Sequence, residues 1–135
     1  FATVEYVAAS LADMDLHVLT EVPADLNVMD FEQEKLNARG IPSQIFPRYR
    51  VTNFSHTMGG GYTAGYYSYK WAEVLDCDAY EAFLETGDIF NQEVAEKFRK
   101  YVLTPGGIDN GMVMYTNFRG REPQIDALLK NRGLK

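Results

Sequence analysis

Side chains that bind metals or form disulfides are scarce in this chain of 135 residues. Cys77 is its one cysteine, so the chain can form no internal disulfide and no cluster of thiolate metal ligands. Its two histidines are His17 and His56, and neither belongs to a His-Glu-x-x-His sequence, the helical pattern that holds zinc with two imidazoles. We therefore expect no bound metal within these residues.

Long apolar runs and clusters of basic residues are also missing. No stretch approaches the roughly 20 apolar residues that a membrane-spanning helix needs. The formal net charge is −6, and the basic residues are scattered along the chain. We therefore expect neither a membrane nor a nucleic acid as a partner. The length and the apolar fraction of 46% are typical of one globular domain.

The run of Asp13, Asp15 and His17 is the nearest approach to a set of metal ligands. Residues two apart on a helix point to different faces, so these three side chains do not converge. We interpret the run as a solvated, acidic end of a helix.

Helical periodicity extends over most of the chain and predicts an all-α fold. Asn27 and Asn91 are expected N-caps, Asp109 is expected to cap a later helix, and Pro123 stands where a last short helix should begin. The expected helices cover residues 2–19, 28–39, 63–85, 91–103 and 109–118, followed by the short last one. The segment 41–58 is an expected connector, with room for one short strand between Tyr49 and Ser55.

A glycine run, Gly59 to Gly61, precedes a segment rich in tyrosine. On a helical wheel that segment has one polar and one apolar side. The polar side holds Tyr62, Tyr66, Tyr69, Glu73 and Asp76, and the side expected to be buried holds Ala64, Tyr67, Trp71, Val74 and Leu75.

The tyrosines on the polar side have two interpretations. Tyrosines at helical spacing often serve packing alone. A separate apolar side leaves these phenols free, however, and beside His56 they could form a hydrogen-bonding wall for a polar ligand. A phenol is neutral near pH 7 and can donate to a developing oxyanion. The glycine run lacks the lysine of a phosphate-binding loop, so we interpret it as a hinge for His56 and Tyr62.

Three segments resemble the thimet oligopeptidase family of zinc peptidases. Ser55-His56 and the run from Gly59 to Leu75 resemble the substrate-binding segment of that family. Phe1 to Ser10 resembles a stretch that follows the family's zinc helix, and Phe118 to Leu129 resembles its C-terminus. The triple glycine and the preceding Pro-Arg-Tyr-Arg are most similar to the dipeptidyl carboxypeptidases of the family.

This resemblance implies that residues 1–135 are the C-terminal fragment of a peptidase catalytic domain whose zinc-binding helix lies upstream. It implies that the parent enzyme binds zinc and hydrolyses short peptides, releasing C-terminal dipeptides, in the cytoplasm or the periplasm. The fragment's partners would be a short peptide and the N-terminal zinc-binding part of the same parent chain. We expect the fragment alone to bind no metal and to be inactive.

The resemblance also assigns roles to individual residues. His56, Tyr62 and Tyr69 match catalytic residues that contact the substrate and stabilise the tetrahedral intermediate. The residues matched to substrate binding are Tyr66, Gly60 and Gly61.

Release of dipeptides from a C-terminus requires recognition of a free carboxylate. Arg48 and Arg50 are the nearest candidates, because a guanidinium can bind a carboxylate through two hydrogen bonds. The alternative for both is a place as surface arginines in a connector. The alternative for the whole chain is a self-standing helical module that binds peptides without cleaving them.

Overall fold

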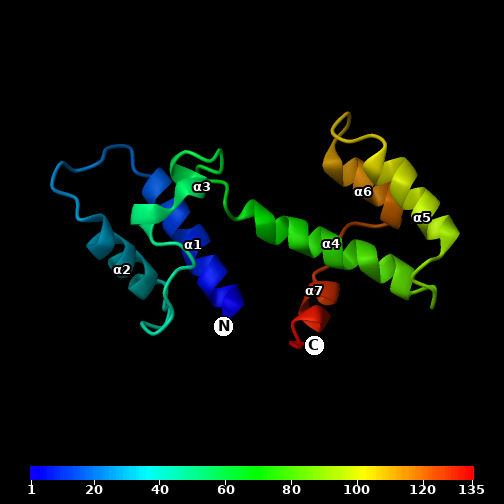
Figure 1. Ribbon diagram of the computed structural model, residues 1–135, viewed down its shortest axis with the longest axis horizontal. Helices are drawn as coiled ribbons and strands as arrows, with labels where there is room; N and C mark the ends of the chain where they lie inside the picture. Colours follow the sequence, from blue (N-terminus) through cyan, green and yellow to red (C-terminus); the bar gives the residue numbers. More distant parts are fainter. The chain divides into compact units, whose positions relative to one another are not determined.

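The computed structural model describes residues 1–135, which fold into helices joined by turns and loops with no strand (Figure 1). The chain divides into two compact units, Phe1–Tyr69 and Lys70–Lys135. The all-α prediction is confirmed. None of the helices has both the length and the apolar character needed to cross a membrane.

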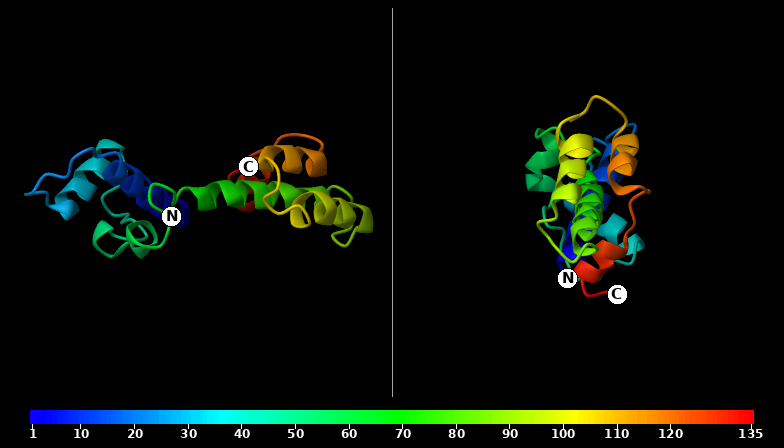
Figure 2. Two further views of the ribbon diagram at one scale, coloured as in Figure 1. Left: turned by 90° about the horizontal axis from the view of Figure 1, so that it is seen from above. Right: turned by 90° about the vertical axis from the view of Figure 1, so that its right-hand side faces the viewer.

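In the first unit, helix α1 (Ala2–His17) packs against helix α2 (Val28–Ala38), and the two lie side by side (Figure 2). Ala8, Ala9 and Ala12 form a fully buried stripe of small side chains on α1. Because these side chains are short, other segments can approach the helix closely. Asn27 caps α2 as predicted, since its side chain accepts a hydrogen bond from the Met29 N–H at 3.0 Å.

The connector contains no strand between Tyr49 and Ser55, so that expectation was wrong. The chain instead forms a 3₁₀ turn, Val51–Asn53, followed by the one-turn helix α3 (Ser55–Met58). The buried carboxylate of Glu32 on α2 explains the turn. It accepts the Val51 N–H at 2.8 Å and binds Arg50 Nε at 2.5 Å. The Val51 N–H is therefore not available to a neighbouring strand.

The glycine run follows α3 and folds back over it. A Cβ atom on Gly60 would lie 2.9 Å from the Ser55 carbonyl oxygen and 3.0 Å from the Cα of His56. Gly61 has a φ of +82°, in the left-handed region that glycine adopts without steric cost. The loop closes through a 3.0 Å hydrogen bond from the Tyr62 N–H to the His56 carbonyl.

Helix α4 (Ser68–Leu84) begins five residues later than Thr63, the predicted start. The reason is the carboxylate of Asp13 on α1, which accepts the N–H groups of Ala64 and Tyr66 at 3.0 and 3.1 Å. Ala64 has a φ of +52°, a left-handed conformation that costs a residue other than glycine about 1–2 kcal/mol. The segment 63–67 is therefore a turn held by α1 and not the first turn of α4.

In the second unit, α4 is followed by α5 (Gln92–Phe98), a π-helical turn (Arg99–Leu103), α6 (Gly111–Arg119) and α7 (Asp126–Asn131). Asn91 caps α5 as predicted, by accepting the Val94 N–H at 3.1 Å. The cap of α6 is Asn110 and not its neighbour Asp109, and α7 begins three residues after Pro123.

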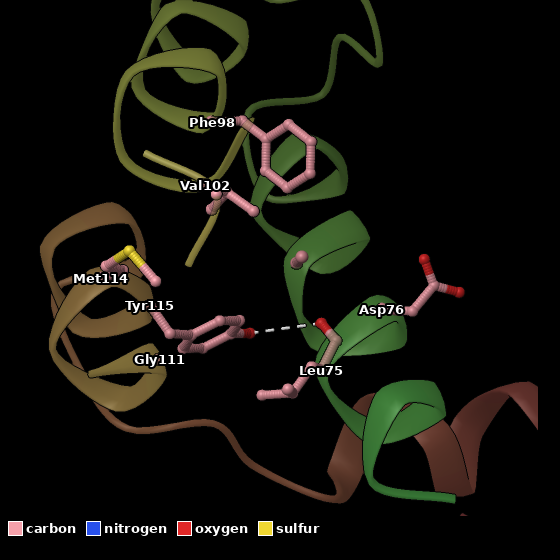
Figure 3. A pocket seen from close by; sticks show the side chains of 9 residues that line it. Leu75, Asp76, Phe98, Val102, Gly111, Met114 and Tyr115 are labelled. Atoms are coloured by element: carbon pink, nitrogen blue, oxygen red, sulfur yellow. Dashed lines mark hydrogen bonds between the residues drawn. The ribbon is translucent and has the colours of Figure 1, made fainter. Parts of the chain in front are cut away.

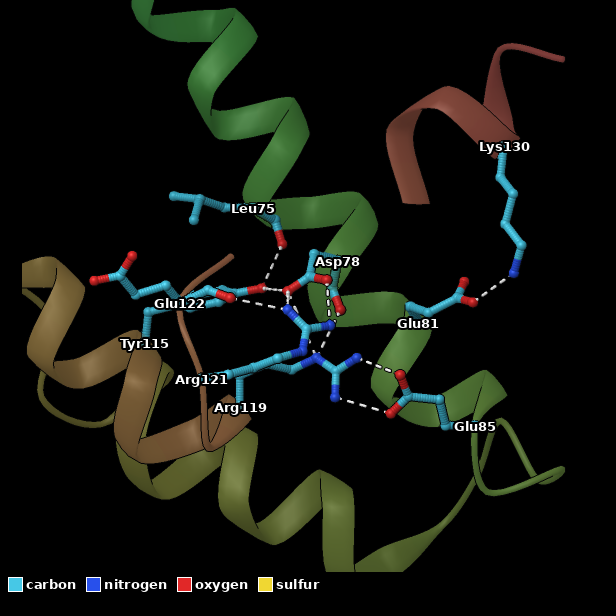
Figure 4. A network of polar contacts seen from close by, with 9 residues as sticks. All are labelled: Leu75, Asp78, Glu81, Glu85, Tyr115, Arg119, Arg121, Glu122 and Lys130. Carbon is cyan, nitrogen blue, oxygen red and sulfur yellow. Dashed lines mark hydrogen bonds and ion pairs between the residues drawn. The ribbon is translucent and has the colours of Figure 1, made fainter. Parts of the chain in front are cut away.

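A buried carboxylate, Asp78 of α4, joins the helices of the second unit (Figure 4). Arg121 binds it through Nη2 at 2.7 Å and Nη1 at 3.1 Å, and the Tyr115 hydroxyl donates to it at 2.6 Å. Burial by itself would raise the pKa of Asp78, but the hydrogen bonds and charges of these partners outweigh it and hold the pKa below its ordinary value. Arg119 donates to the Asp78 carbonyl and pairs with Glu85.

Gly60→Ala should destabilise the first unit by about 1–3 kcal/mol, because the added methyl group would press on the backbone of α3. Gly59→Ala is the matched control, since the φ of Gly59 lies outside the left-handed region and a Cβ atom there would meet open space. Urea unfolding followed by circular dichroism measures both effects, and the amide resonance of His56 should shift in the Gly60 variant alone. Equal losses in the two variants would contradict this account of the hinge.

Asp78→Asn should lower the free energy of unfolding by about 3–5 kcal/mol, because it removes the negative charge to which Arg121 and Tyr115 donate hydrogen bonds. Glu96→Gln, which breaks an exposed pair with Arg99, should stay near wild type.

The pH dependence provides a second check. The contribution of a carboxylate with a depressed pKa is present above its unfolded pKa and is lost as the pH falls through its folded pKa. The difference in free energy of unfolding between wild type and Asp78→Asn should therefore become smaller as the pH falls, because protonation of Asp78 removes the same charge. If this difference stays constant as the pH falls, the charge of Asp78 does not stabilise the second unit.

Candidate substrate-binding site

Four tyrosines and one histidine meet in the first unit and form an aromatic cluster, consisting of Tyr49, His56, Tyr62, Tyr66 and Tyr69. Its members come from the connector, from α3, from the loop after the glycine run and from the start of α4. The His56 ring lies at the centre, 5.0–6.4 Å from each of the other four rings. The three residues predicted to be catalytic, His56, Tyr62 and Tyr69, are thus brought together.

His56 combines a buried ring atom with an open hollow. Its Nδ1 atom is buried and has no hydrogen-bond partner, which is uncommon for a polar atom in a folded protein. A hollow of about 520 Å³ lies over the glycine loop, lined by Ser55, His56, Met58, Gly59 and Gly60. His56 is therefore positioned at the surface where a ligand could reach it. Gly60, one of the residues predicted to contact substrate, lines the same hollow, and Gly61 follows at the hinge.

Tyr62 and Tyr69 are stacked, with ring centroids 5.0 Å apart and planes inclined by 23°. Hydrogen bonding with Tyr62, and to a smaller extent burial, raises the pKa of Tyr69 to about 12. The Tyr69 hydroxyl therefore keeps its proton throughout the neutral range. As a neutral donor it can stabilise negative charge on an oxygen atom without having to be neutralised first.

Tyr66 lies in the core and not on the exposed side where the helical wheel placed it. Its ring is 3% exposed, packs against Ala9 and Phe54, and stacks on Tyr6 at 4.9 Å. Burial raises the pKa of Tyr66, and the nearby positive charge of Arg48 opposes part of that rise. Tyr66 supports the cluster from beneath in this structure.

The apolar side of the wheel was also partly wrong. Val74 is buried as expected, but Tyr67 is 46% exposed and Trp71 is 62% exposed. For Tyr67 the physical reason is the left-handed residue Ala64, which interrupts the helical progression of 100° per residue before α4 begins. Positions before Ser68 cannot be placed on the same wheel as those after it.

The two candidate arginines have different surroundings. Arg50 is bound to the buried carboxylate of Glu32, and its guanidinium lies 5.5 Å from the Phe46 ring centroid. Arg48 forms no ion pair, and its guanidinium lies 5.9 Å from the ring centroid of Tyr49, within the aromatic cluster. Arg48 is therefore the arginine whose charge is available to a ligand.

Asp13 is another residue whose surroundings differ from the prediction. It was expected at a solvated helix end, but it is 1% exposed and holds the loop between Tyr62 and Tyr69 through two backbone N–H groups. His17 Nδ1 lies 2.8 Å from its carboxylate, one helical turn away. The spacing of Asp13 and His17 by four residues was the available signal, because such residues do share a helix face.

A second cavity of about 310 Å³ lies in the second unit (Figure 3). Its walls are mainly carbon, from residues that include Leu75, Phe98, Val102 and Met114. The Tyr115 hydroxyl beside it already bonds to the Leu75 carbonyl and to Asp78. The Tyr115 hydroxyl is therefore not free to bind a ligand in this cavity.

A catalytic metal would need several metal-ligating side chains that converge on one point. Nowhere in the structure do three or more histidine, cysteine, aspartate or glutamate side chains converge in a way that could hold a metal ion. His56 stands among phenols, and His17 is next to a carboxylate that two backbone groups already occupy. These residues do not fit a zinc centre.

Known proteins place the chain in a family. The model of peptidase family M3 matches residues 1–134. The chain is 40% identical to the dipeptidyl carboxypeptidase of Salmonella typhimurium over 131 residues, which are 96% of this chain and 19% of that relative. It is 50% identical to oligopeptidase A of the same bacterium over 95 residues, which are 70% of this chain and 14% of the relative.

A plant relative is similar over almost the same range. The organellar oligopeptidase A of Arabidopsis thaliana is 39% identical over 126 residues, 90% of this chain and 16% of that protein. The chain thus spans less than a fifth of the length of each of these relatives. Because the family model covers the chain from its first residue to its last but one, and because the aromatic cluster falls within that range, the chain belongs to peptidase family M3.

Proposed function

We propose that this chain forms the substrate-binding and transition-state-stabilising wall of a metallopeptidase that hydrolyses short peptides. The observation that carries the proposal is the convergence of His56, Tyr62 and Tyr69 beside a glycine hinge. Membership of peptidase family M3 supports a peptide as the ligand.

Each of the three side chains has a role that its environment favours. Tyr69 donates a hydrogen bond to the carbonyl oxygen of the scissile bond as negative charge develops there. Tyr62 stacks on Tyr69 and fixes the direction of its ring. His56 faces the hollow over the glycine loop and binds the peptide backbone of the substrate.

The release of C-terminal dipeptides is the more specific part of the proposal. Such a reaction needs a cation near the site to bind the free carboxylate of the substrate, and Arg48 is placed to do so. Similarity to the dipeptidyl carboxypeptidase of Salmonella typhimurium over 96% of this chain supports this specificity. Similarity to an oligopeptidase A over 70% of the chain supports the broader activity equally.

The catalytic metal and the general base belong, in this proposal, to another part of the same parent protein. The residues of this chain do not form a zinc site. The relatives are about five times longer, which leaves ample room for such a part. We therefore assign the present residues to the binding of substrate and the stabilisation of charge, and we assign them no role in activating water.

The isolated chain should neither hydrolyse peptides nor bind zinc stoichiometrically. The test is to incubate the purified chain with zinc and a blocked tripeptide, and then to measure the product by chromatography and the metal by mass spectrometry. Turnover accompanied by one bound zinc ion per chain would overturn the assignment of the metal to another part of the protein.

Tyr69→Phe in the full-length peptidase should lower kcat on the order of 100–1,000-fold, as expected for the loss of one donor to an oxyanion. The substitution keeps the ring and its stacking and removes the hydroxyl group alone. KM should change little, because the lost hydrogen bond is formed mainly in the transition state.

Tyr67→Phe is the matched control. Tyr67 is two residues away, is exposed and contacts none of the rings of the aromatic cluster. Steady-state kinetics on both variants distinguishes the roles. If Tyr69→Phe retains most of its kcat, or if Tyr67→Phe loses as much, the hydroxyl of Tyr69 is not the donor.

A further inference from the structure

The carboxylate of Asp13 is buried beneath the site, although it touches none of the proposed catalytic side chains. Its side chain is fully buried on α1, at the end of the stripe formed by Ala8, Ala9 and Ala12. A carboxylate in such a place costs free energy unless hydrogen bonds satisfy it. Its donors therefore indicate what the residue does.

Two of those donors are backbone N–H groups of the loop that joins Tyr62 to Tyr69. Asp13 Oδ1 accepts from Ala64 at 3.0 Å, and Oδ2 accepts from Tyr66 at 3.1 Å. Both oxygens are thus engaged by segments more than 50 residues away in sequence. A single carboxylate thus binds the N–H groups of two residues of the same turn, with one residue between them.

The turn that Asp13 holds is a strained one. Ala64 has a φ of +52°, which a residue with a Cβ atom rarely adopts without external support. The hydroxyl of Tyr6 donates to the Tyr66 carbonyl from the same helix, so α1 holds the turn at both its N–H and its C=O groups. The backbone of the turn is therefore held by α1 in addition to its own hydrogen bond, from the Gly65 N–H to the Tyr62 carbonyl at 2.8 Å.

The held turn lies between the two stacked tyrosines. Ala64 follows Tyr62 by two residues, and Tyr66 precedes Tyr69 by three. On the other side of Tyr62 lies the glycine run, which is held on α3 by the 3.0 Å hydrogen bond from the Tyr62 N–H to the His56 carbonyl. Tyr62 is thus held from α3 on one side, and Asp13 on α1 holds the turn that follows it.

We propose that Asp13 is a positioning residue of the peptidase site, which acts through the backbone of Ala64 and Tyr66 to aim the hydroxyl of Tyr69. This inference rests on the proposed function. A displacement of about 1 Å at a reacting group can cost roughly 100-fold in rate, so a residue that fixes the turn can control kcat without touching substrate.

The test uses four variants of the full-length peptidase: Asp13→Asn, Tyr69→Phe, the double variant, and Asp15→Asn. Asn retains one acceptor oxygen and turns an NH₂ group toward a backbone donor. Asp13→Asn should lower kcat on the order of 100-fold, with a smaller change in KM. Asp15→Asn is the matched control, because Asp15 lies on the same helix and pairs with exposed Arg39, and it should leave kcat near wild type.

The double variant separates positioning from mere stability. If Asp13 acts through Tyr69, Asp13→Asn should cause little further loss in protein that already carries Tyr69→Phe. The same fold loss in both backgrounds would overturn the inference, since a purely structural residue lowers the two activities independently. An unchanged kcat in Asp13→Asn, alongside a large loss in Tyr69→Phe, would overturn the inference and leave the proposed function intact. If Tyr69→Phe does not lower kcat, both the inference about Asp13 and the proposed function are overturned.

If Asp13→Asn does not fold, the same comparison is made in protein that also carries Ala64→Gly. Glycine adopts the left-handed conformation without help, so the loop no longer needs the carboxylate to hold Ala64 there. Ala64→Gly should then restore part of the kcat that Asp13→Asn loses. In the same proteins, faster hydrogen exchange at the amides of residues 64 and 66 should accompany each loss. Full activity together with fast exchange at these amides would overturn the positioning role.

Discussion

The carboxylate of Asp13 determines where helix α4 begins and how the tyrosine segment lies on the first unit. By accepting the N–H groups of Ala64 and Tyr66, it prevents both residues from joining the helix that their sequence favours. Tyr66 is thereby turned into the core against Ala9 and Phe54, while Tyr69 remains exposed at the start of α4. The geometry of the aromatic cluster thus depends on one buried acid on α1, which binds two of the five residues that precede α4.

The two units solve the problem of a buried carboxylate in different ways. Asp13 accepts two backbone N–H groups and lies 2.8 Å from His17 Nδ1 on its own helix, whereas Asp78 is satisfied by Arg121 and the Tyr115 hydroxyl. Backbone donors fix the path of the chain, because they cannot move without moving the peptide itself. Side-chain donors join helices and leave the path of each helix unchanged. This difference explains why Asp13 is adjacent to the proposed site, while Asp78 serves the cohesion of the second unit.

The features that could be predicted from sequence are those set by local interactions. Asn27 and Asn91 bond to N–H groups two or three residues ahead, so their roles as caps could be recognised from sequence alone. The contacts of Asp13 and Glu32 span many more residues, and neither the interrupted start of α4 nor the turn at Val51 could be foreseen without them. The exposure of Tyr67 follows from the same cause, because the wheel was drawn through a turn.

Candidate site residues were easier to predict than their geometry. His56, Tyr62 and Tyr69 were chosen by residue type and resemblance, and the structure brings them together. Tyr66 belongs to the same sequence motif, yet its surroundings differ because its backbone is bound to Asp13 and Tyr6. A motif specifies which side chains are present near a site. The long-range hydrogen bonds beneath the motif decide which of them face a ligand and which support the others.

The choice of phenols for this wall is consistent with its surroundings. A cationic donor at the position of Tyr69 would attract the substrate's carboxylates as strongly as the oxyanion, and would compete with Arg48 for the free C-terminus. A neutral hydroxyl whose pKa is about 12 binds a developing charge without drawing carboxylates into the reacting position. Under the proposed function the two tasks are separate, because Arg48 would bind charge that is already present and Tyr69 would respond to charge that forms during the reaction. That separation would require the Tyr69 hydroxyl to be held in place before the reaction begins, which is the role we propose for the carboxylate of Asp13 beneath the loop.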